Sequence, residues 1–127
     1  VYGDRQPLKG QYAPVIGLFL RQKKNNNPMT VVGDGLQTRD FTNVEDVVNA
    51  NILACETDNK DILGEIINIG TGRSFSILDL VNIIKGEYKH IPARPAEARN
   101  TVADTSKAKN LLGWVPKIKL EDYLKKQ

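Results

Sequence analysis

The chain has 127 residues, 40% of them hydrophobic and 26% charged, and a formal net charge of +3, which is typical of one soluble globular domain and excludes a disordered chain. Its single cysteine and single histidine, Cys55 and His90, exclude an internal disulfide and argue against a transition-metal site. Because no apolar run could span a membrane, no signal peptide is recognisable and the basic excess is mild, we expect a cytoplasmic protein that binds neither membrane nor nucleic acid.

The residues from Pro14 to Val32 predict a helix followed by a strand. Proline is favoured in the first turn of a helix, and an apolar run follows Pro14 directly. Two lysines, three asparagines and Pro28 then predict the end of that helix. Residues 29–32 form a short run rich in β-branched side chains. The run stops at the glycines of the GDG sequence, as a strand entering a turn would.

A second helix is predicted after Phe41. Thr42 and Glu45 have the spacing of a capping box, in which a hydroxyl and a carboxylate satisfy the first free N–H groups of a helix. We expect this helix to bury a largely apolar face, which is made up of Val44, Val47, Val48, Asn51, Ile52 and Cys55.

A strand, a turn and a third helix are predicted next. Residues 65–69 form a short apolar run, which we interpret as a buried strand. Ser76 and Asp79 repeat the capping-box spacing in front of an apolar stripe. The GTGRS sequence at 70–74 could be a phosphate-binding loop or a tight turn. Because neither G-x-x-x-x-G-K-[ST] nor G-x-G-x-x-G is complete, we favour the turn.

The last part of the chain predicts a loop and two short helices. The run from 90 to 99 contains two prolines and two arginines, which favours an extended loop, and 101–103 would form a short strand. A helix capped by Asp104 or Thr105 and closed by Gly113 should follow. A final amphipathic helix ends the chain.

About five helices thus alternate with three or four short strands, which predicts an α/β fold, or an α+β fold if the chain is a fragment. So few strands would make an incomplete doubly wound sheet. The chain also opens on the strand-like residues VYG without an initiator methionine. We therefore expect a single domain, residues 1–127, that is part of a larger protein.

Three arginines are candidates for ligand binding. Arg39 follows the GDG turn, and Arg94 and Arg99 lie in the proline-containing loop. A guanidinium is always charged and can bind phosphate oxygens with two parallel hydrogen bonds, so arginines from separate loops would suit a diphosphate. The alternative is that Arg39 only pairs with Asp40 or Glu45 and that the other two are solvated. No catalytic residue is expected, because no side chain stands in a recognisable nucleophile or acid–base setting.

A series of sequence blocks runs through the whole chain in this order: VYGDRQ, YAPVIGLFL, GDGLQTRDFTNVEDVVNA, EIINIGTG, SILDLV, ARPAEARNTVADTSKAKNLLGW and KIKLEDYL. With this spacing, the series resembles the C-terminal half of the extended short-chain dehydrogenase/reductase enzymes that act on nucleotide sugars. Within that family it is most similar to the UDP-glucose and UDP-N-acetylglucosamine 4-epimerases.

The resemblance implies a sugar-nucleotide-binding subdomain with the last strands of a Rossmann-type sheet. In that family a Gly-rich turn binds NAD, and a Tyr-x-x-x-Lys pair deprotonates a sugar hydroxyl while NAD accepts a hydride. Return of the hydride to the other face of the 4-keto intermediate inverts the carbon. Neither sequence motif occurs here, so the N-terminal NAD-binding part is missing, and this chain alone should bind no cofactor and have no turnover.

The resemblance also implies the residues that bind the substrate. Arg39 and Arg94 match the arginines that contact the diphosphate, and Glu97 matches the acidic residue that contacts the ribose. Thr30 and Val32 match positions that line the uracil pocket. Catalytic, cofactor-binding and metal-binding residues are not expected in this chain.

The first interpretation is therefore the UDP-sugar-binding portion of an NAD-dependent 4-epimerase. A nucleotide-sugar dehydratase or decarboxylase is the alternative within the family, and a stand-alone module that binds a nucleotide or a partner chain is the alternative outside it. The missing half predicts an exposed apolar flank around Val1, Ile67 and Ile69, and hence association with that half or into a homo-oligomer.

The sequence departs from the family pattern in the loop that carries Arg94. The family usually has glycine and aspartate where Ala96 and Glu97 stand.

Overall fold

The computed structural model describes residues 1–8, 10 and 13–127. Of the sequence blocks quoted above, YAPVIGLFL begins at Tyr12, which lies outside the described residues. The elements follow one another in this order: α1 (Val15–Lys24), β1 (Met29–Val32), β2 (Thr38–Arg39), α2 (Val44–Glu56), the 3₁₀ helix η1 (Lys60–Ile62), β3 (Phe75–Ser76), α3 (Ile77–Ile84), β4 (Tyr88–Ile91), α4 (Ser106–Leu112) and α5 (Leu120–Leu124).

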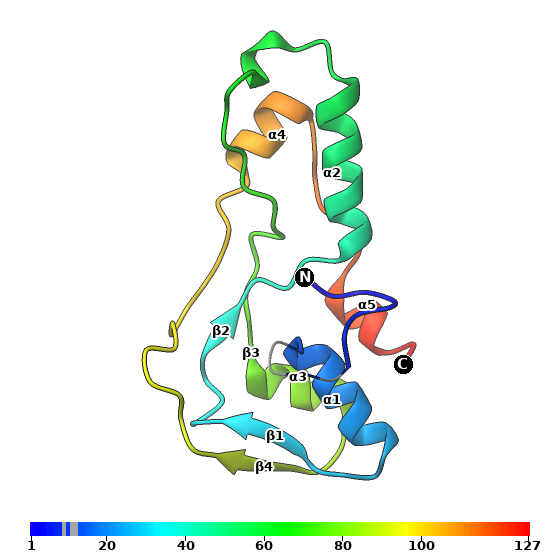
Figure 1. The fold of residues 1–127 in the computed structure, drawn as a ribbon, viewed down its shortest axis with the longest axis vertical. Helices are drawn as coiled ribbons and strands as arrows, with labels where there is room; N and C mark the ends of the chain where they lie inside the picture. Colours follow the sequence, from blue (N-terminus) through cyan, green and yellow to red (C-terminus); the bar gives the residue numbers. More distant parts are fainter. Residues whose placement is uncertain (9, 11–12) are drawn as a thin grey trace.

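The molecule is elongated and has two regions (Figure 1). The first, which we call the sheet region, consists of the four strands with α1, α3 and α5. The second, which we call the helical region, consists of α2, η1 and α4 with residues 57–70 and 113–118. Helices and strands alternate along the chain, so the predicted α/β class is confirmed. Within the described ranges, no helix is long and apolar enough to cross a membrane.

Two pairs of short strands organise the sheet region. β1 lies parallel to β4, with Met29 opposite Tyr88. β2 lies antiparallel to β3, with Arg39 opposite Phe75. The strand predicted at 29–32 is therefore confirmed.

The extended loop predicted from 90 to 99 is wrong at its beginning, where His90 and Ile91 belong to β4. Three of the four β4 residues are exposed, so no alternating apolar pattern marks this strand in the sequence. β4 is held by its backbone ladder to β1 instead. The first bond of this pairing runs from the Met29 N–H to the Glu87 carbonyl at 2.8 Å.

The strands predicted at 65–69 and 101–103 are wrong, because neither segment pairs as a strand with another described segment. Ile67 and Ile69 do point inward, and they pack against the buried cluster of the helical region. The alternating pattern of residues 65–69 therefore indicates which of their side chains point inward. A strand also needs a neighbour for its N–H and C=O groups, and the periodicity of one segment carries no information about that neighbour.

The exposed apolar flank has other members than predicted. Val1 is 67% exposed, whereas Ile67 and Ile69 are half-buried. The strongly exposed apolar side chains near these two isoleucines are Leu63 at 76% and Ile66 at 85%.

The start of α3 and the end of α4 follow the predicted signals. The Asp79 N–H donates to Ser76 Oγ at 3.0 Å, and the Ser76 N–H donates to Asp79 Oδ2 at 2.8 Å, so the capping box of α3 is confirmed. Gly113 ends α4 in the left-handed conformation with a φ of 63°, as a glycine at this position does at the lowest steric cost.

The capping box predicted at α2 is wrong. Asn43 is the N-cap residue, and its side-chain oxygen accepts the Glu45 N–H at 2.9 Å. Thr42 is part of the extended backbone before the helix, where its carbonyl accepts the Tyr2 N–H at 2.9 Å. A contact with the start of the chain therefore shifts the cap by one residue.

The buried face predicted for α2 is also wrong. Its exposed side chains include Val48 at 52% and Ile52 at 47%, and its buried residues are Asp46 and Ala50. We call the exposed residues the apolar stripe of α2; it consists of Val44, Val48, Ile52 and Cys55. Because the thiol of Cys55 is exposed, this residue does not act as a small core side chain.

The hydrogen bonds of Asp46 explain which face of α2 is buried. Its carboxylate accepts the N–H groups of Lys117 and Ile118, both at 3.0 Å. Its main-chain carbonyl accepts the indole N–H of Trp114, also at 3.0 Å. The buried side of α2 is thus fixed by hydrogen bonds to a segment about 70 positions later, which no helical periodicity can reveal.

Each region has its own buried cluster. The cluster of the sheet region is the larger one and consists of Tyr2, Ile16, Phe19, Met29, Val31, Phe41, Ile77, Leu80, Val81, Ile84, Leu120 and Leu124. The cluster of the helical region consists of Ala50, Ala108 and Trp114.

Candidate functional site

Arg39 ends β2 and contacts the loop that follows β4. Its Nη2 lies 3.0 Å from Glu97 Oε1, and its Nη1 donates to the Thr38 carbonyl at 2.8 Å. Among the described ion pairs, neither of the two expected partners, Asp40 and Glu45, pairs with this guanidinium. The structure thus brings together two of the residues predicted to bind the substrate, although 58 positions separate them in the sequence.

The loop that carries Glu97 is attached to the GDG turn and to β2. Arg99 donates to both carboxylate oxygens of Asp34, at 2.8 and 2.9 Å. This guanidinium lowers the pKa of Asp34 to about 2. The Thr38 N–H donates to the Arg99 carbonyl at 2.8 Å, and the Thr38 hydroxyl donates to Asn100 Oδ1 at 3.1 Å. Arg99, one of the three candidate arginines, is therefore paired with Asp34, although its side chain remains exposed.

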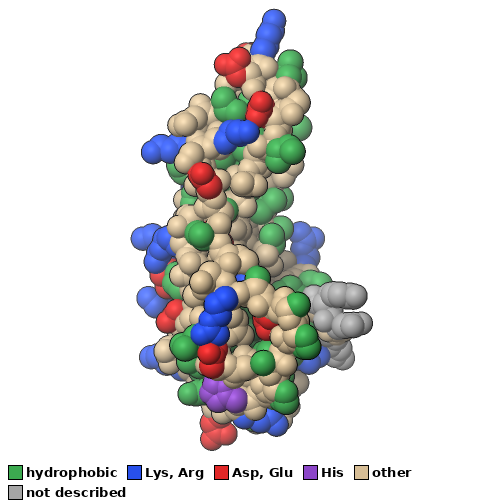
Figure 2. All heavy atoms as spheres, turned by 90° about the vertical axis from the view of Figure 1, so that its left-hand side faces the viewer, with side chains coloured by type: hydrophobic (Ala, Val, Ile, Leu, Met, Phe, Trp, Pro, Cys, Tyr) green, Lys and Arg blue, Asp and Glu red, His purple; other side chains and the backbone are tan. Residues whose placement is uncertain are grey.

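Arg94 lies in the same loop and is exposed. Ala96 adopts a left-handed φ of 57°, a conformation that costs a residue with a Cβ more than it costs glycine. Figure 2 views the molecule from the side of this loop and shows basic and acidic side chains next to one another over the sheet region. The predicted ligand residues Arg39, Arg94 and Glu97 therefore belong to β2 and to one adjoining loop.

Asp40 follows Arg39 and binds the turn of the GTGRS sequence. Its carboxylate accepts the N–H of Thr71 at 2.8 Å, the hydroxyl of Thr71 at 2.6 Å and the N–H of Gly72 at 2.9 Å. Gly72 has a φ of 68°, so the interpretation as a tight turn is confirmed. A phosphate-binding glycine turn needs free N–H groups, and here a carboxylate already occupies them. This turn does not fit the pyrophosphate of a dinucleotide cofactor.

Thr30 and Val32 direct their backbone groups toward the edge of β1 that β4 does not cover. The N–H groups of Met29 and Gly33 point toward β4 and donate to it at 2.8 and 2.9 Å. Because the backbone of a strand alternates, the N–H and C=O groups of Thr30 and Val32 face the opposite edge. This edge could accept the flat edge of a planar ring with matching donors and acceptors.

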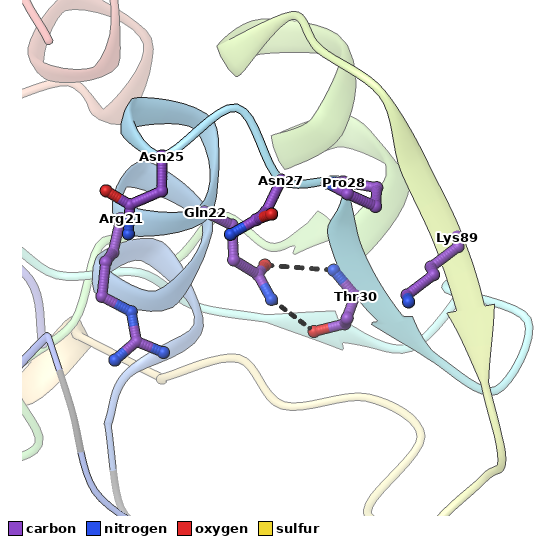
Figure 3. A pocket seen from close by; sticks show the side chains of 7 residues that line it. All are labelled: Arg21, Gln22, Asn25, Asn27, Pro28, Thr30 and Lys89. Atoms are coloured by element: carbon purple, nitrogen blue, oxygen red, sulfur yellow. Dashed lines mark hydrogen bonds between the residues drawn. The ribbon is translucent and has the colours of Figure 1, made fainter.

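Two glutamines occupy the ends of this free edge. Gln22 Oε1 accepts the Thr30 N–H at 3.1 Å, and Gln22 Nε2 donates to Thr30 Oγ1 at 2.9 Å (Figure 3). Gln37 Nε2 donates to the Val32 carbonyl at 3.0 Å. In the described part of the chain, the Thr30 carbonyl and the Val32 N–H keep no partner, so one acceptor and one donor remain side by side.

Sequence reasoning missed Gln22 and Gln37. A glutamine in the last turn of a helix or after a turn carries no local signal, because its partners lie on β1 and are set by packing. Gln22 and Thr30 also line a pocket of about 340 Å³ beside this edge, together with Arg21, Asn25, Asn27, Pro28 and Lys89 (Figure 3).

The chain is similar to known proteins over its whole length. The family model of GDP-mannose 4,6-dehydratase matches residues 1–127. A putative UDP-glucose 4-epimerase of Methanocaldococcus jannaschii is 40% identical over 99% of this chain and 41% of its own length. The chain thus spans about two fifths of the length of such a relative.

Solved structures of two epimerases are similar to this one. The UDP-glucose 4-epimerase of Thermotoga maritima with UDP-glucose has a TM-score of 0.86 and 37% identity over 98% of this chain and 40% of its own. The UDP-glucuronic acid 4-epimerase of Bacillus cereus with UDP-glucuronic acid and NAD has a TM-score of 0.85 and 37% identity over the same shares. The resemblance to nucleotide-sugar 4-epimerases is therefore confirmed, and the chain belongs to the GDP-mannose 4,6-dehydratase family.

Proposed function

We propose that this chain is the UDP-sugar-binding portion of an NAD-dependent 4-epimerase and that it has no turnover by itself. The observation that carries the proposal is the contact between Arg39 and Glu97, which joins β2 to the loop that also holds Arg94. These three residues would bind the part of the ligand that carries the diphosphate and the ribose.

The guanidinium of Arg39 can take a diphosphate without losing its present contacts. A guanidinium has five N–H donors, and the described bonds to Glu97 and to the Thr38 carbonyl use one on each terminal nitrogen. The remaining donors would bind phosphate oxygens, and Arg94 would supply a second cation from the loop. Glu97 orients Arg39 and would accept a ribose hydroxyl with its other oxygen.

The free edge of β1 would bind the base. Uracil presents a ring N–H next to a carbonyl oxygen, and these complement the Thr30 carbonyl and the Val32 N–H. Cytosine and adenine also present one donor beside one acceptor, so these two backbone groups would hold the edge of a base without selecting uracil by themselves.

The glycine turn at Gly70–Gly72 is closed by Asp40, so NAD would bind to the NAD-binding half of a full-length enzyme and not to this turn. When bound, NAD supplies the hydride chemistry of a 4-epimerase. We infer that the NAD-binding half of a full-length enzyme covers the apolar stripe of α2 and the adjoining Val1. Without that half, the stripe would favour self-association.

Isothermal titration calorimetry with UDP, UDP-glucose, UDP-N-acetylglucosamine and UDP-glucuronic acid tests the proposal. We expect binding to the wild-type chain and loss of binding in Arg39→Ala. Lys109→Ala is the matched control, because it removes an exposed cation from the helical region. No heat with any of these ligands at millimolar concentration would instead indicate a structural module or one that binds a partner chain.

A decarboxylase or dehydratase is the second candidate, because UDP-glucuronic acid decarboxylases also occur among the relatives of this chain. Such an enzyme would bind the same class of ligand. The reaction products of this chain joined to an NAD-binding half would distinguish these functions. An epimerase would release a sugar nucleotide with one inverted carbon, and a decarboxylase would release carbon dioxide.

A further inference from the structure

Asp40 accepts hydrogen bonds from two separate segments. Besides the bonds from Thr71 and Gly72, its Oδ2 accepts the N–H of Ala103 at 3.2 Å. Thr71 and Gly72 lead into β3, whereas Ala103 follows the stretch that runs beside Thr38 on the other side. One carboxylate therefore holds both neighbours of β2.

β2 needs such support because it is only two residues long. Two residues provide few ladder bonds, so the direction of the Arg39 side chain depends on how firmly the flanking segments are held. Successive side chains of an extended segment point to opposite sides. Consistent with this alternation, Arg39 contacts Glu97, whereas Asp40 contacts Thr71 and Ala103.

We propose that Asp40 is a positioning residue for Arg39: it anchors the end of β2 from behind and thereby directs the guanidinium toward the diphosphate. The inference rests on the proposed function, because it requires that Arg39 binds the diphosphate. It predicts that Asp40 affects the contribution of the phosphates to affinity, and not the binding of the nucleoside.

The test compares the dissociation constants of uridine and UDP by calorimetry or by NMR titration. In the wild type, UDP should bind more tightly than uridine. Asp40→Ala should weaken UDP by at least about tenfold and leave uridine unchanged, because a small displacement of a binding group has a large effect on its contacts. Asp40→Asn should restore most of the lost affinity, because its side-chain oxygen can still accept from the 71–72 turn.

Thr71→Val is a milder variant that keeps the proposal testable if Asp40→Ala does not fold. It removes the hydroxyl that donates to Asp40 at 2.6 Å and accepts the Arg73 N–H at 3.1 Å. Like Asp40→Ala, it should reduce the ratio by which UDP binds more tightly than uridine. Asp46→Asn is the matched control. It alters the other carboxylate that binds a distant backbone segment, so it should lower stability and leave both affinities unchanged.

Three outcomes would contradict the inference. Equal weakening of uridine and UDP in Asp40→Ala would show a purely structural role, and unchanged affinities would show no role at all. Failure of the wild-type chain to bind UDP would overturn the proposed function, and this inference with it. That result is recognised before any variant is measured.

Discussion

The sheet region and the helical region differ in how much apolar surface each can bury. The sheet region encloses a continuous cluster in which Phe19, Met29 and Leu80 are fully buried. Among the described residues, the apolar cluster of the helical region has one large buried side chain, Trp114, with two alanines, and the apolar stripe of α2 stays exposed. Only the first region is closed around its own core. The exposed stripe of the second region supports our proposal that another part of a full-length enzyme covers it.

The largest effect should come from Trp114→Ala. This residue is 1% exposed and is the one large buried apolar side chain that the structure describes in the helical region, so its loss should cost about 3–5 kcal/mol in that region. Hydrogen exchange should then show unprotected amides in α2 and α4, with protection retained in α1 and α3. Loss of protection throughout the molecule would show that the two regions unfold as one unit. Leu80→Ala is the matching substitution in the sheet region, and there the amides of α1 and α3 should lose protection.

Asp46→Ala should have the next largest effect. The substitution leaves the N–H groups of Lys117 and Ile118 without an acceptor, which should cost about 1–3 kcal/mol. Urea unfolding followed by circular dichroism measures the change. Asp46→Asn is the control, because its single side-chain oxygen can keep one of the two bonds and should recover part of the loss. Equal destabilisation by both variants would count against these hydrogen bonds.

A double substitution, Val48→Lys with Ile52→Lys, should change association more than stability. Both side chains are about half exposed, so the free energy of unfolding should stay within about 0.5 kcal/mol. Sedimentation velocity should show a self-associating wild type and a more monomeric variant. Glu56→Lys reverses a charge at the end of the same helix without removing an apolar side chain, and it should not have this effect. A wild type that stays monomeric at high concentration would contradict the inferred role of the stripe.

The smallest effect concerns the pair of Asp34 and Arg99. The pKa of Asp34 is lowered from 3.8 to about 2, chiefly by the hydrogen bonds from Arg99. A lowered pKa in the folded state contributes stability above about pH 4, and that contribution is lost as the pH falls toward 2. Because both side chains are exposed, solvent screens most of it.

An NMR pH titration tests this pair directly. In Arg99→Gln, the carboxyl of Asp34 should titrate closer to its ordinary pKa. Asp104 is the internal control, because its pKa is lowered by Ser106 and should not respond. An unchanged titration of Asp34 would mean that the pair does not persist in solution.

Much of the fold could be predicted wherever the cause is local. The capping box of α3, the glycine that ends α4 and the strand 29–32 depend on residues within a few positions of one another. β4 escaped prediction because its residues are mostly exposed, and its pairing partner lies on β1. The segment 65–69 has the sequence pattern of a strand, but no described segment pairs with it.

The candidate site shows the same division. The residue types that suit a nucleotide sugar, including Arg39 and Glu97, could be named from the resemblance. That Arg39 contacts Glu97, and not Asp40 or Glu45, depends on a loop 58 positions away. The roles of Gln22 and Gln37 at the edge of β1 also had no signal in the sequence.

The sequence by itself therefore determined the family, the α/β class and the order of most helices, and it supplied the arginines that we propose bind a diphosphate. These follow from local periodicity, caps and a series of blocks along one chain. Only the tertiary structure decided which side of α2 is buried, what Asp40 and Asp46 bind, and which carboxylate pairs with Arg39. The physical reason is that a buried donor or acceptor must be satisfied by whatever group folding brings beside it, and that group can lie anywhere in the chain.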